Sequence, residues 1–98
     1  MPERRQNERQ LTIDNDVRTV TTLPNGAVLE GMVENYSLGG TRVAGPTTGM
    51  SLGDRVEVVF VFLTKERVRY EGRVAHLDPN GQHFGVEFLS EPRRIEAS

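Results

Sequence analysis

Three arginines near the N-terminus have the type and spacing to bind an anion. Arg4, Arg5 and Arg9 lie within the first ten residues, which contain no hydrophobic residue apart from Met1. Because such a segment has nothing to bury, we expect residues 1–10 to form a flexible arm when nothing binds them. A guanidinium group donates paired hydrogen bonds to phosphate oxygens or to guanine O6 and N7. The arm is therefore predicted to fold over an anionic ligand.

A second polar group follows further along the chain. Asn35 and Ser37 alternate with Tyr36 where a predicted strand ends, and Gly39 and Gly40 come next. Alternate residues of a strand point to one face, so the amide and the hydroxyl would lie together. They could face the edge of a base while glycine lets a flat ring approach the backbone. An ordinary turn uses the same residue types, so this group alone does not specify a ligand.

Other chemistry is not predicted. His76 and His83 flank the turn at Pro79 without nearby carboxylates at ligand spacing, so we expect structural roles and no metal site. Ser37, His76 and Asp78 supply the residue types of a hydrolytic triad, but nothing places Ser37 for attack. The chain has no cysteine, which removes disulfides, thiolate ligands and cysteine nucleophiles. We expect a protein that is not an enzyme.

The elements that position these residues are predicted to be strands. The 98 residues suit one domain, and hydrophobic residues make up 36% of them. Period-two alternation and turn residues predict six strands and no helix. Pro-Asn-Gly occurs twice and predicts the turns of two hairpins. The predicted strands are residues 16–22, 27–37, 39–43, 55–64, 67–77 and 82–89.

Six short strands in so small a chain most economically close on themselves, because closure removes exposed edges. We predict an all-β fold, a small six-stranded antiparallel β-barrel at residues 11–98 that follows the arm. Residues 56–63 are apolar on both faces apart from Glu57, so a partner surface or the C-terminal segment is expected to cover the second face. We expect the solvated face of the strand at residues 67–77 to carry Arg67, Arg69 and Arg73.

Charge and hydropathy restrict the partners. The net charge of -2 excludes a broadly basic surface for long nucleic acid, although eleven of the twelve basic residues are arginine. No apolar run approaches the roughly 20 residues that cross a bilayer. We expect a cytoplasmic location without direct membrane insertion, for a whole protein or for a module of a membrane protein.

The chain resembles the PilZ domain family of bacterial cyclic diguanylate (c-di-GMP) receptors. The resemblance rests on two polar motifs in order, Arg5-x-x-x-Arg9 and then Asn35-x-Ser37-x-x-Gly40. That family forms six-stranded barrels of this size, which commonly finish in a Gly-x-x-Phe strand like residues 85–88. The resemblance implies that Arg5 and Arg9 bind phosphates and guanine edges.

The resemblance also implies roles for the second group. Asn35 and Ser37 would bind guanine or its neighbouring phosphate, and Gly40 would leave room for the base. Many members of the family carry Asp at the position of Asn35, and Asn offers one acceptor where Asp offers two. An arginine directly before the first motif arginine, here Arg4, resembles the variant that takes two intercalated ligand molecules.

The resemblance further implies a regulatory role, in which ligand binding orders the arm and controls an attached or partner protein such as a membrane polysaccharide synthase, for example bacterial cellulose synthase.

Two alternative functions stay open. One is a PilZ-like structural or interaction barrel without nucleotide binding. The other is a binder of single-stranded nucleic acid, which needs aromatic stacking platforms on its strands. Most of the six aromatic residues occupy the alternating core positions of the predicted strands. They therefore argue against stacking platforms, and we expect no nucleic acid partner.

Overall fold

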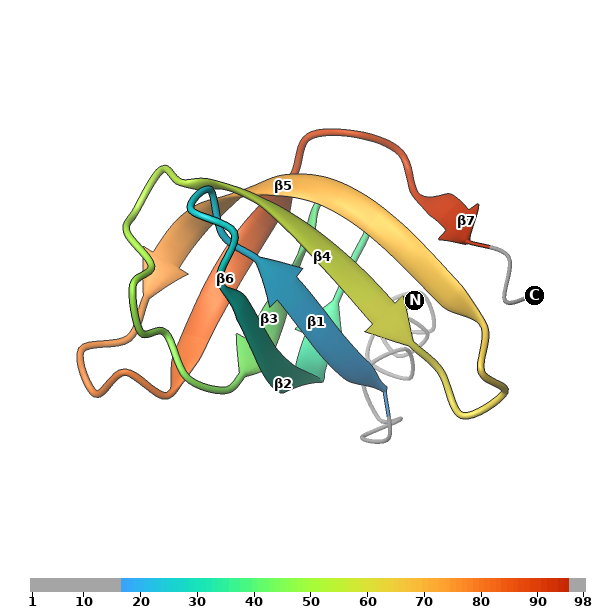
Figure 1. Ribbon diagram of the computed structural model, residues 1–98, viewed down its shortest axis with the longest axis horizontal. Coiled ribbons are helices and arrows are strands. Elements are labelled where there is room, and N and C mark those ends of the chain that lie inside the picture. Colours follow the sequence, from blue (N-terminus) through green and yellow to red (C-terminus); the bar gives the residue numbers. More distant parts are fainter. Residues whose placement is uncertain (1–16, 96–98) are drawn as a thin grey trace, which may run out of the picture.

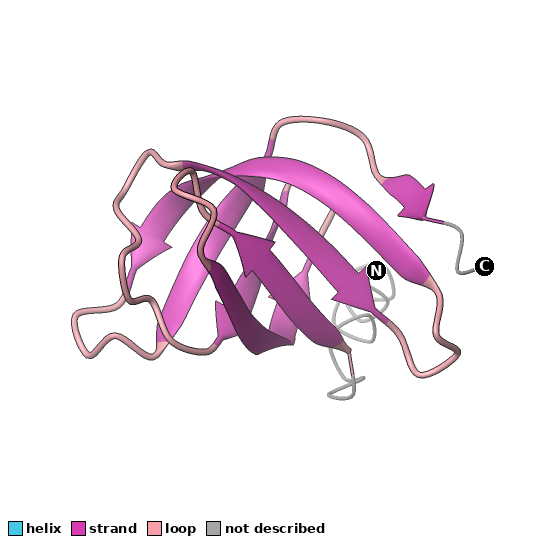
Figure 2. Cartoon of the chain, viewed as in Figure 1, coloured by secondary structure: helices cyan, strands magenta, loops and turns pink. Residues whose placement is uncertain are grey.

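The computed structural model describes residues 17–95, which form seven strands joined by loops and turns (Figures 1 and 2). Within this range no residue is helical. All six predicted strands are present, with ends that shift by up to a few residues. The strands are β1 (Arg18–Thr22), β2 (Val28–Tyr36), β3 (Gly40–Ala44), β4 (Arg55–Val61), β5 (Arg67–Leu77), β6 (His83–Phe88) and β7 (Arg93–Ile95).

Strands β1 to β6 close into a barrel. Their hydrogen-bonded order is β4-β1-β2-β3-β6-β5, and β4 also pairs with β5, so the sheet returns on itself. Every pair is antiparallel. The predicted six-stranded antiparallel barrel is confirmed, and its closure leaves none of these strands as a free edge.

The seventh strand was not predicted. β7 pairs with Arg67–Arg69 of β5 and lies apart from the closed ring in Figure 1. Its sequence, Arg-Arg-Ile, is too short to show alternation, so its strand conformation depends on the hydrogen bonds that β5 supplies. β7 pairs with β5 and not with β4, and the cover of the second face of residues 56–63 by a partner surface or the C-terminal segment stays a prediction.

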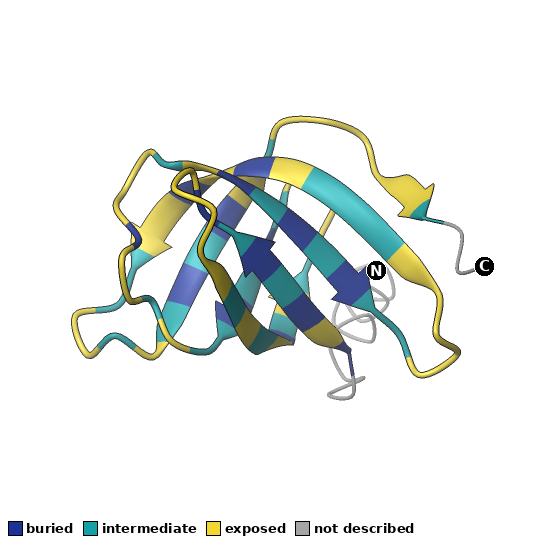
Figure 3. Cartoon of the chain, in the orientation of Figure 1, coloured by how far each residue is buried: buried dark blue, intermediate teal, exposed yellow. Residues whose placement is uncertain are grey.

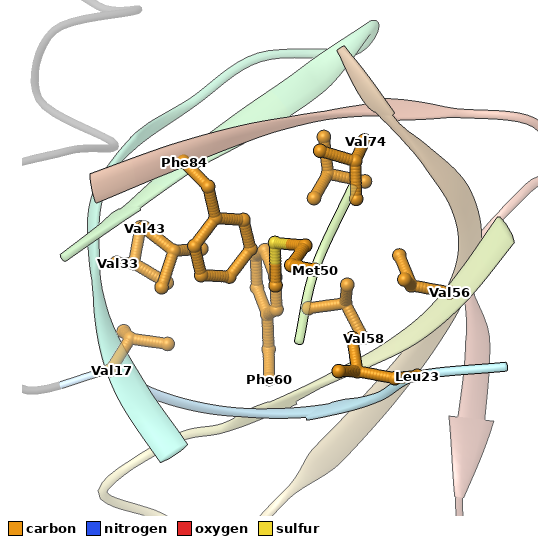
Figure 4. Packing of buried hydrophobic residues seen from close by; sticks show 11 residues of the cluster. Val17, Leu23, Val33, Val43, Met50, Val56, Val58, Phe60, Val74 and Phe84 are labelled. Carbon is orange, nitrogen blue, oxygen red and sulfur yellow. The ribbon is translucent and has the colours of Figure 1, made fainter. Parts of the chain in front are cut away.

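The core fills the inside of the barrel. β4 alternates buried Val56, Val58 and Phe60 with half-buried residues, as the bands of Figure 3 show. Figure 4 shows side chains from several strands pointing into the same interior, with the rings of Phe60 and Phe84 near its centre. The buried hydrophobic residues are Val17, Leu23, Val33, Val43, Met50, Val56, Val58, Phe60, Val74, Phe84 and Val86.

The two Pro-Asn-Gly turns repeat the same chemistry. Gly26 and Gly81 have φ angles of 91° and 75°, which favour glycine. In each turn the asparagine side-chain oxygen accepts a hydrogen bond from the backbone N–H two residues later, at 2.8 Å for Asn25 and 3.1 Å for Asn80. Both turns predicted from the sequence are confirmed.

An aromatic cluster occupies the end of the barrel where β2, β4 and β6 finish and β5 begins. Phe60 packs against the rings of Tyr36, Phe62, Tyr70 and Phe88, with centroids 5.2–6.3 Å apart. Tyr70 and Phe88 also stack at 3.9 Å. The turn that joins β2 to β3 lies at this end, so the cluster supports the turn from inside.

Candidate functional site

A β-bulge turns Asn35 outward. Strict alternation from buried Val33 would point Asn35 into the core, but the pairing with β3 shifts by one residue between Val33 and Asn35. The extra residue lets both Glu34 and Asn35 lie on the outside of the barrel before Tyr36 turns inward against Phe60. Asn35 is exposed and Tyr36 is half buried.

The turn after the bulge is held by hydrogen bonds. The Ser37 backbone N–H donates to the Gly40 carbonyl at 2.8 Å, and the Ser37 hydroxyl oxygen accepts from the Gly39 N–H at 3.3 Å. The Thr41 hydroxyl donates to the Asn35 carbonyl at 2.8 Å. Asn35 and Ser37 are both exposed while Tyr36 between them packs inward, as the alternation predicts.

The two glycines of this turn differ in their surroundings. A Cβ atom on Gly39 would meet no heavy atom within 4 Å, so Gly39 leaves open space above the turn. A Cβ atom on Gly40 would lie 2.3 Å from the Val86 carbonyl oxygen. Gly40 is therefore needed for the close approach of β3 to β6, whatever else it does. Room for a base at Gly40 stays a prediction.

Next to the bulge the outer surface is hollowed. The hollow is open and has a volume of about 640 Å³, which is within the range of ligand sites. It extends from the bulge of β2 to β3, because Asn35 and Arg42 are partners in the register of these strands. Its lining residues are Met32, Val33, Glu34, Asn35, Arg42 and Ala44.

Arg42 belongs to a group of polar side chains on this face, which we call the charge cluster: Glu34, Arg42, His76, Asp78 and His83. The Arg42 Nε–H donates to Glu34 Oε1 at 2.9 Å, and Arg42 Nη2 lies 3.5 Å from Asp78 Oδ2. His83 lies between the same carboxylates, with Nδ1 3.0 Å from Asp78 Oδ2 and Nε2 3.1 Å from Glu34 Oε2. The contact with Asp78 is a hydrogen bond, and the contact with Glu34 is an ion pair only when the His83 ring is protonated.

Asp78 is the centre of the charge cluster. His76 Nε2 lies 3.0 Å from Asp78 Oδ1. The hydrogen bond with His76, opposed by desolvation and aided by the charge of Arg42 and by His83, lowers the pKa of the Asp78 carboxyl below its ordinary value of 3.8. The expectation that no carboxylate accompanies the histidines is wrong: Asp78 contacts both of them within the β5–β6 turn, and the pairing of β2, β3 and β6 brings Glu34 to His83. Even so, no three metal-ligating side chains are placed to hold a metal ion in residues 17–95.

The arginines of the predicted arm, Arg4, Arg5 and Arg9, lie outside the described residues. The described chain begins at Val17, eight residues after Arg9. The Val33 N–H donates to the Val17 carbonyl at 3.0 Å, and Val33 lines the hollow. The described chain therefore starts at the edge of the hollow.

Sequence reasoning missed the charge cluster as part of the site. The alternation of Thr41, Arg42 and Val43 does indicate that Arg42 points outward. Asp78 gives no such signal, because it lies 36 residues after Arg42 in the sequence and reaches it only through the pairing of β3 with β6. Of the strand arginines expected on a solvated face, Arg67 and Arg73 are exposed and Arg69 is half buried, 3.2 Å from Glu57.

Comparison with known proteins identifies relatives of the chain. A family model described as "PilZ domain" matches residues 3–97. Among solved structures, the chain is similar to the PilZ domain of CeSA from a cellulose synthesizing bacterium, with 18% identity and a TM-score of 0.66 over 81% of this chain and 80% of that chain. No curated protein matches. In residues 17–95 there is no helix long and apolar enough to cross a membrane.

Proposed function

We propose that this chain, which belongs to the PilZ domain family, is a receptor for c-di-GMP. PilZ domains are in general receptors for this ligand, and they are regulatory ligand-binding domains and not catalysts. The observation that carries the proposal is the outward position of Asn35 and Ser37, which the bulge and the turn fix beside an open hollow. The family match also includes the three arginines of the arm.

The arm arginines and the residues of the β2–β3 turn contact different parts of the ligand. Arg5 and Arg9 pair with phosphates and guanine edges, and Asn35 and Ser37 contact guanine or its neighbouring phosphate. The position of Val17 supports this division, because it brings the chain to the edge of the hollow. From Arg9 to Val17 the chain can extend at most about 26–29 Å, so Arg9 is able to reach the hollow.

Ligand binding orders the arm. Fixing about seven arm residues costs roughly 1–2 kcal/mol each in backbone entropy. Each charge-assisted hydrogen bond contributes about 1.5–3 kcal/mol, so two arginines that donate paired bonds roughly offset that cost, but only with ligand present. The arm is then ordered with c-di-GMP and loose without it, and this change is the signal.

The signal acts on an attached or partner protein. We infer a cytoplasmic effector such as a membrane polysaccharide synthase, for example a cellulose synthase, with this chain as a separate protein or as a domain of it. The likeness to the CeSA domain supports the fold of such a module, at 18% identity. Arg4 adds positive charge beside the first motif arginine, and we propose that it allows a second, intercalated ligand molecule to bind.

Isothermal titration calorimetry tests this function. We expect tight binding of c-di-GMP, a ligand-to-protein ratio near two, and poor binding of GMP and GTP, because only the cyclic dimer presents two linked guanylates. Equal affinity for GMP would contradict the proposal. Absence of binding to any of the three would favour a PilZ-like interaction barrel, and a mobility shift with oligonucleotides would favour a nucleic acid binder.

A further inference from the structure

Arg42 lies on the wall of the hollow that the proposed ligand would enter. It is the partner of Asn35 in the register of β2 and β3, and both residues line the hollow. About 43% of the Arg42 side chain is exposed, so a ligand can reach it. The two polar motifs of the sequence do not include it.

The guanidinium of Arg42 is held in position. Glu34 accepts a hydrogen bond from Nε at 2.9 Å, and Asp78 lies 3.5 Å from Nη2. These carboxylates are fixed in turn by His83, which contacts both of them at 3.0–3.1 Å. An arginine that served only to solvate the surface would not need this support. Arg73, on the same barrel wall, has one carboxylate partner, Glu87, and both side chains are about half exposed.

The contacts of Arg42 restrict what it can offer a ligand. Its positive charge is already offset by two carboxylates, which weakens any pairing with a phosphate. Its Nε and one Nη2 position face those carboxylates. What remains is the flat face of the guanidinium, the two N–H groups of Nη1 and the second N–H of Nη2. A planar guanidinium stacks well on an aromatic ring, and Met32 and Ala44 add apolar surface to the same hollow.

We propose that Arg42 is a further ligand-binding residue, which stacks its guanidinium on a guanine base and is positioned by Glu34 and Asp78. This inference rests on the proposed binding of c-di-GMP. It assigns the two sides of the site different chemistry. The arm arginines neutralise phosphate charge, and Arg42 provides a planar cation, held between two carboxylates, on which a base can stack.

Three variants test the role of Arg42 by calorimetry with c-di-GMP at low and high salt. Arg42→Gln removes the charged plane, Arg42→Lys keeps the charge without the plane, and Arg73→Gln is the matched control on the same sheet. We expect both Arg42 variants to bind about 3- to 30-fold more weakly, because neither side chain offers a guanidinium plane that stacks on the base. The salt dependence of binding should stay as in the wild type, and Arg73→Gln should bind normally. Thermal denaturation checks that each variant is folded.

Each outcome decides between the two claims. Wild-type affinity in Arg42→Gln overturns the inference and leaves the proposed function standing. Full affinity in Arg42→Lys shows that a point charge suffices, which also overturns the stacking contact. An equal loss in Arg73→Gln shows a general effect of surface charge. If the wild-type chain itself binds no c-di-GMP, the proposed function fails and this inference fails with it.

Discussion

The β2–β3 turn and the charge cluster border one hollow, but they are built in different ways. The turn comes from consecutive residues, Asn35 to Gly40, and its hydrogen bonds join residues within six positions of one another. The charge cluster joins β2, β3 and β6 with Asp78 and the end of β5, and it exists only because β3 and β6 pair in the barrel. A local motif can be found in a sequence, whereas a cluster assembled across strands needs the fold.

The largest expected effect lies outside both regions and tests whether they bind ligand without the arm. We expect Arg5→Ala or Arg9→Ala to abolish detectable c-di-GMP binding, because each arginine supplies charge-assisted hydrogen bonds of about 1.5–3 kcal/mol each. Arg55→Ala removes the same charge from the exposed start of β4 and is the control. Calorimetry measures the binding of c-di-GMP, and thermal denaturation checks that each variant is folded. A lost thermal transition in either arm variant would show that the arginine serves the fold and not the ligand.

The next effect shows how far the local turn depends on tertiary packing. Gly40→Ala should lower the free energy of unfolding by about 1–3 kcal/mol, because the new Cβ would meet the Val86 carbonyl oxygen at 2.3 Å. Gly39→Ala places its Cβ in open space and should leave the melting temperature unchanged. Thermal denaturation of both variants measures the difference.

The same pair locates the ligand. If a base approaches the turn closely, Gly39→Ala weakens binding of c-di-GMP although its fold is intact. Equal melting temperatures for the two variants would contradict the tight approach of β3 to β6.

A loss of similar size, in binding and not in stability, is expected from the hydroxyl of the turn. Ser37→Ala should weaken c-di-GMP binding by about 1–3 kcal/mol, or roughly 5- to 150-fold, because a polar group of the ligand loses its partner. Ser90→Ala is a matched control, since the Ser90 hydroxyl also accepts a backbone N–H, that of Glu71 at 3.2 Å, away from the turn. Titration of both variants gives the comparison, and an unchanged affinity in Ser37→Ala would remove Ser37 from the site.

The smallest effect belongs to the charge cluster and depends on pH. The pKa of Asp78 is lowered in the folded protein, so its contacts stabilise the fold above pH 3.8 and this contribution is lost as the pH falls through the lower folded value. Asp78→Asn should remove that part of the acid destabilisation. Melting temperatures from pH 6 to pH 2 test this, and we expect the wild type to lose slightly more stability than the variant. Parallel curves would show that Asp78 contributes nothing to the pH dependence.

Much of the fold follows from local patterns. The alternation of residues 67–77 and the two Pro-Asn-Gly turns predict strands and hairpins that the structure contains. β7 could not be predicted, because three residues carry no period and their pairing comes from β5. On the face of residues 56–63 for which a cover is expected, Val59 and Val61 lie half buried beside Arg69 and Arg67 of the neighbouring strand.

The sequence by itself determined the strand pattern, the turns and the identity of the motif residues, because these depend on neighbours within a few positions. The tertiary structure decided which way Asn35 points, since the bulge is a property of the pairing between β2 and β3. It also decided that Gly40 is needed against Val86 and that Arg42 is held by Asp78, because both contacts cross between strands far apart in the chain. Hydrogen-bond register acts between strands, so a single strand's sequence does not contain it.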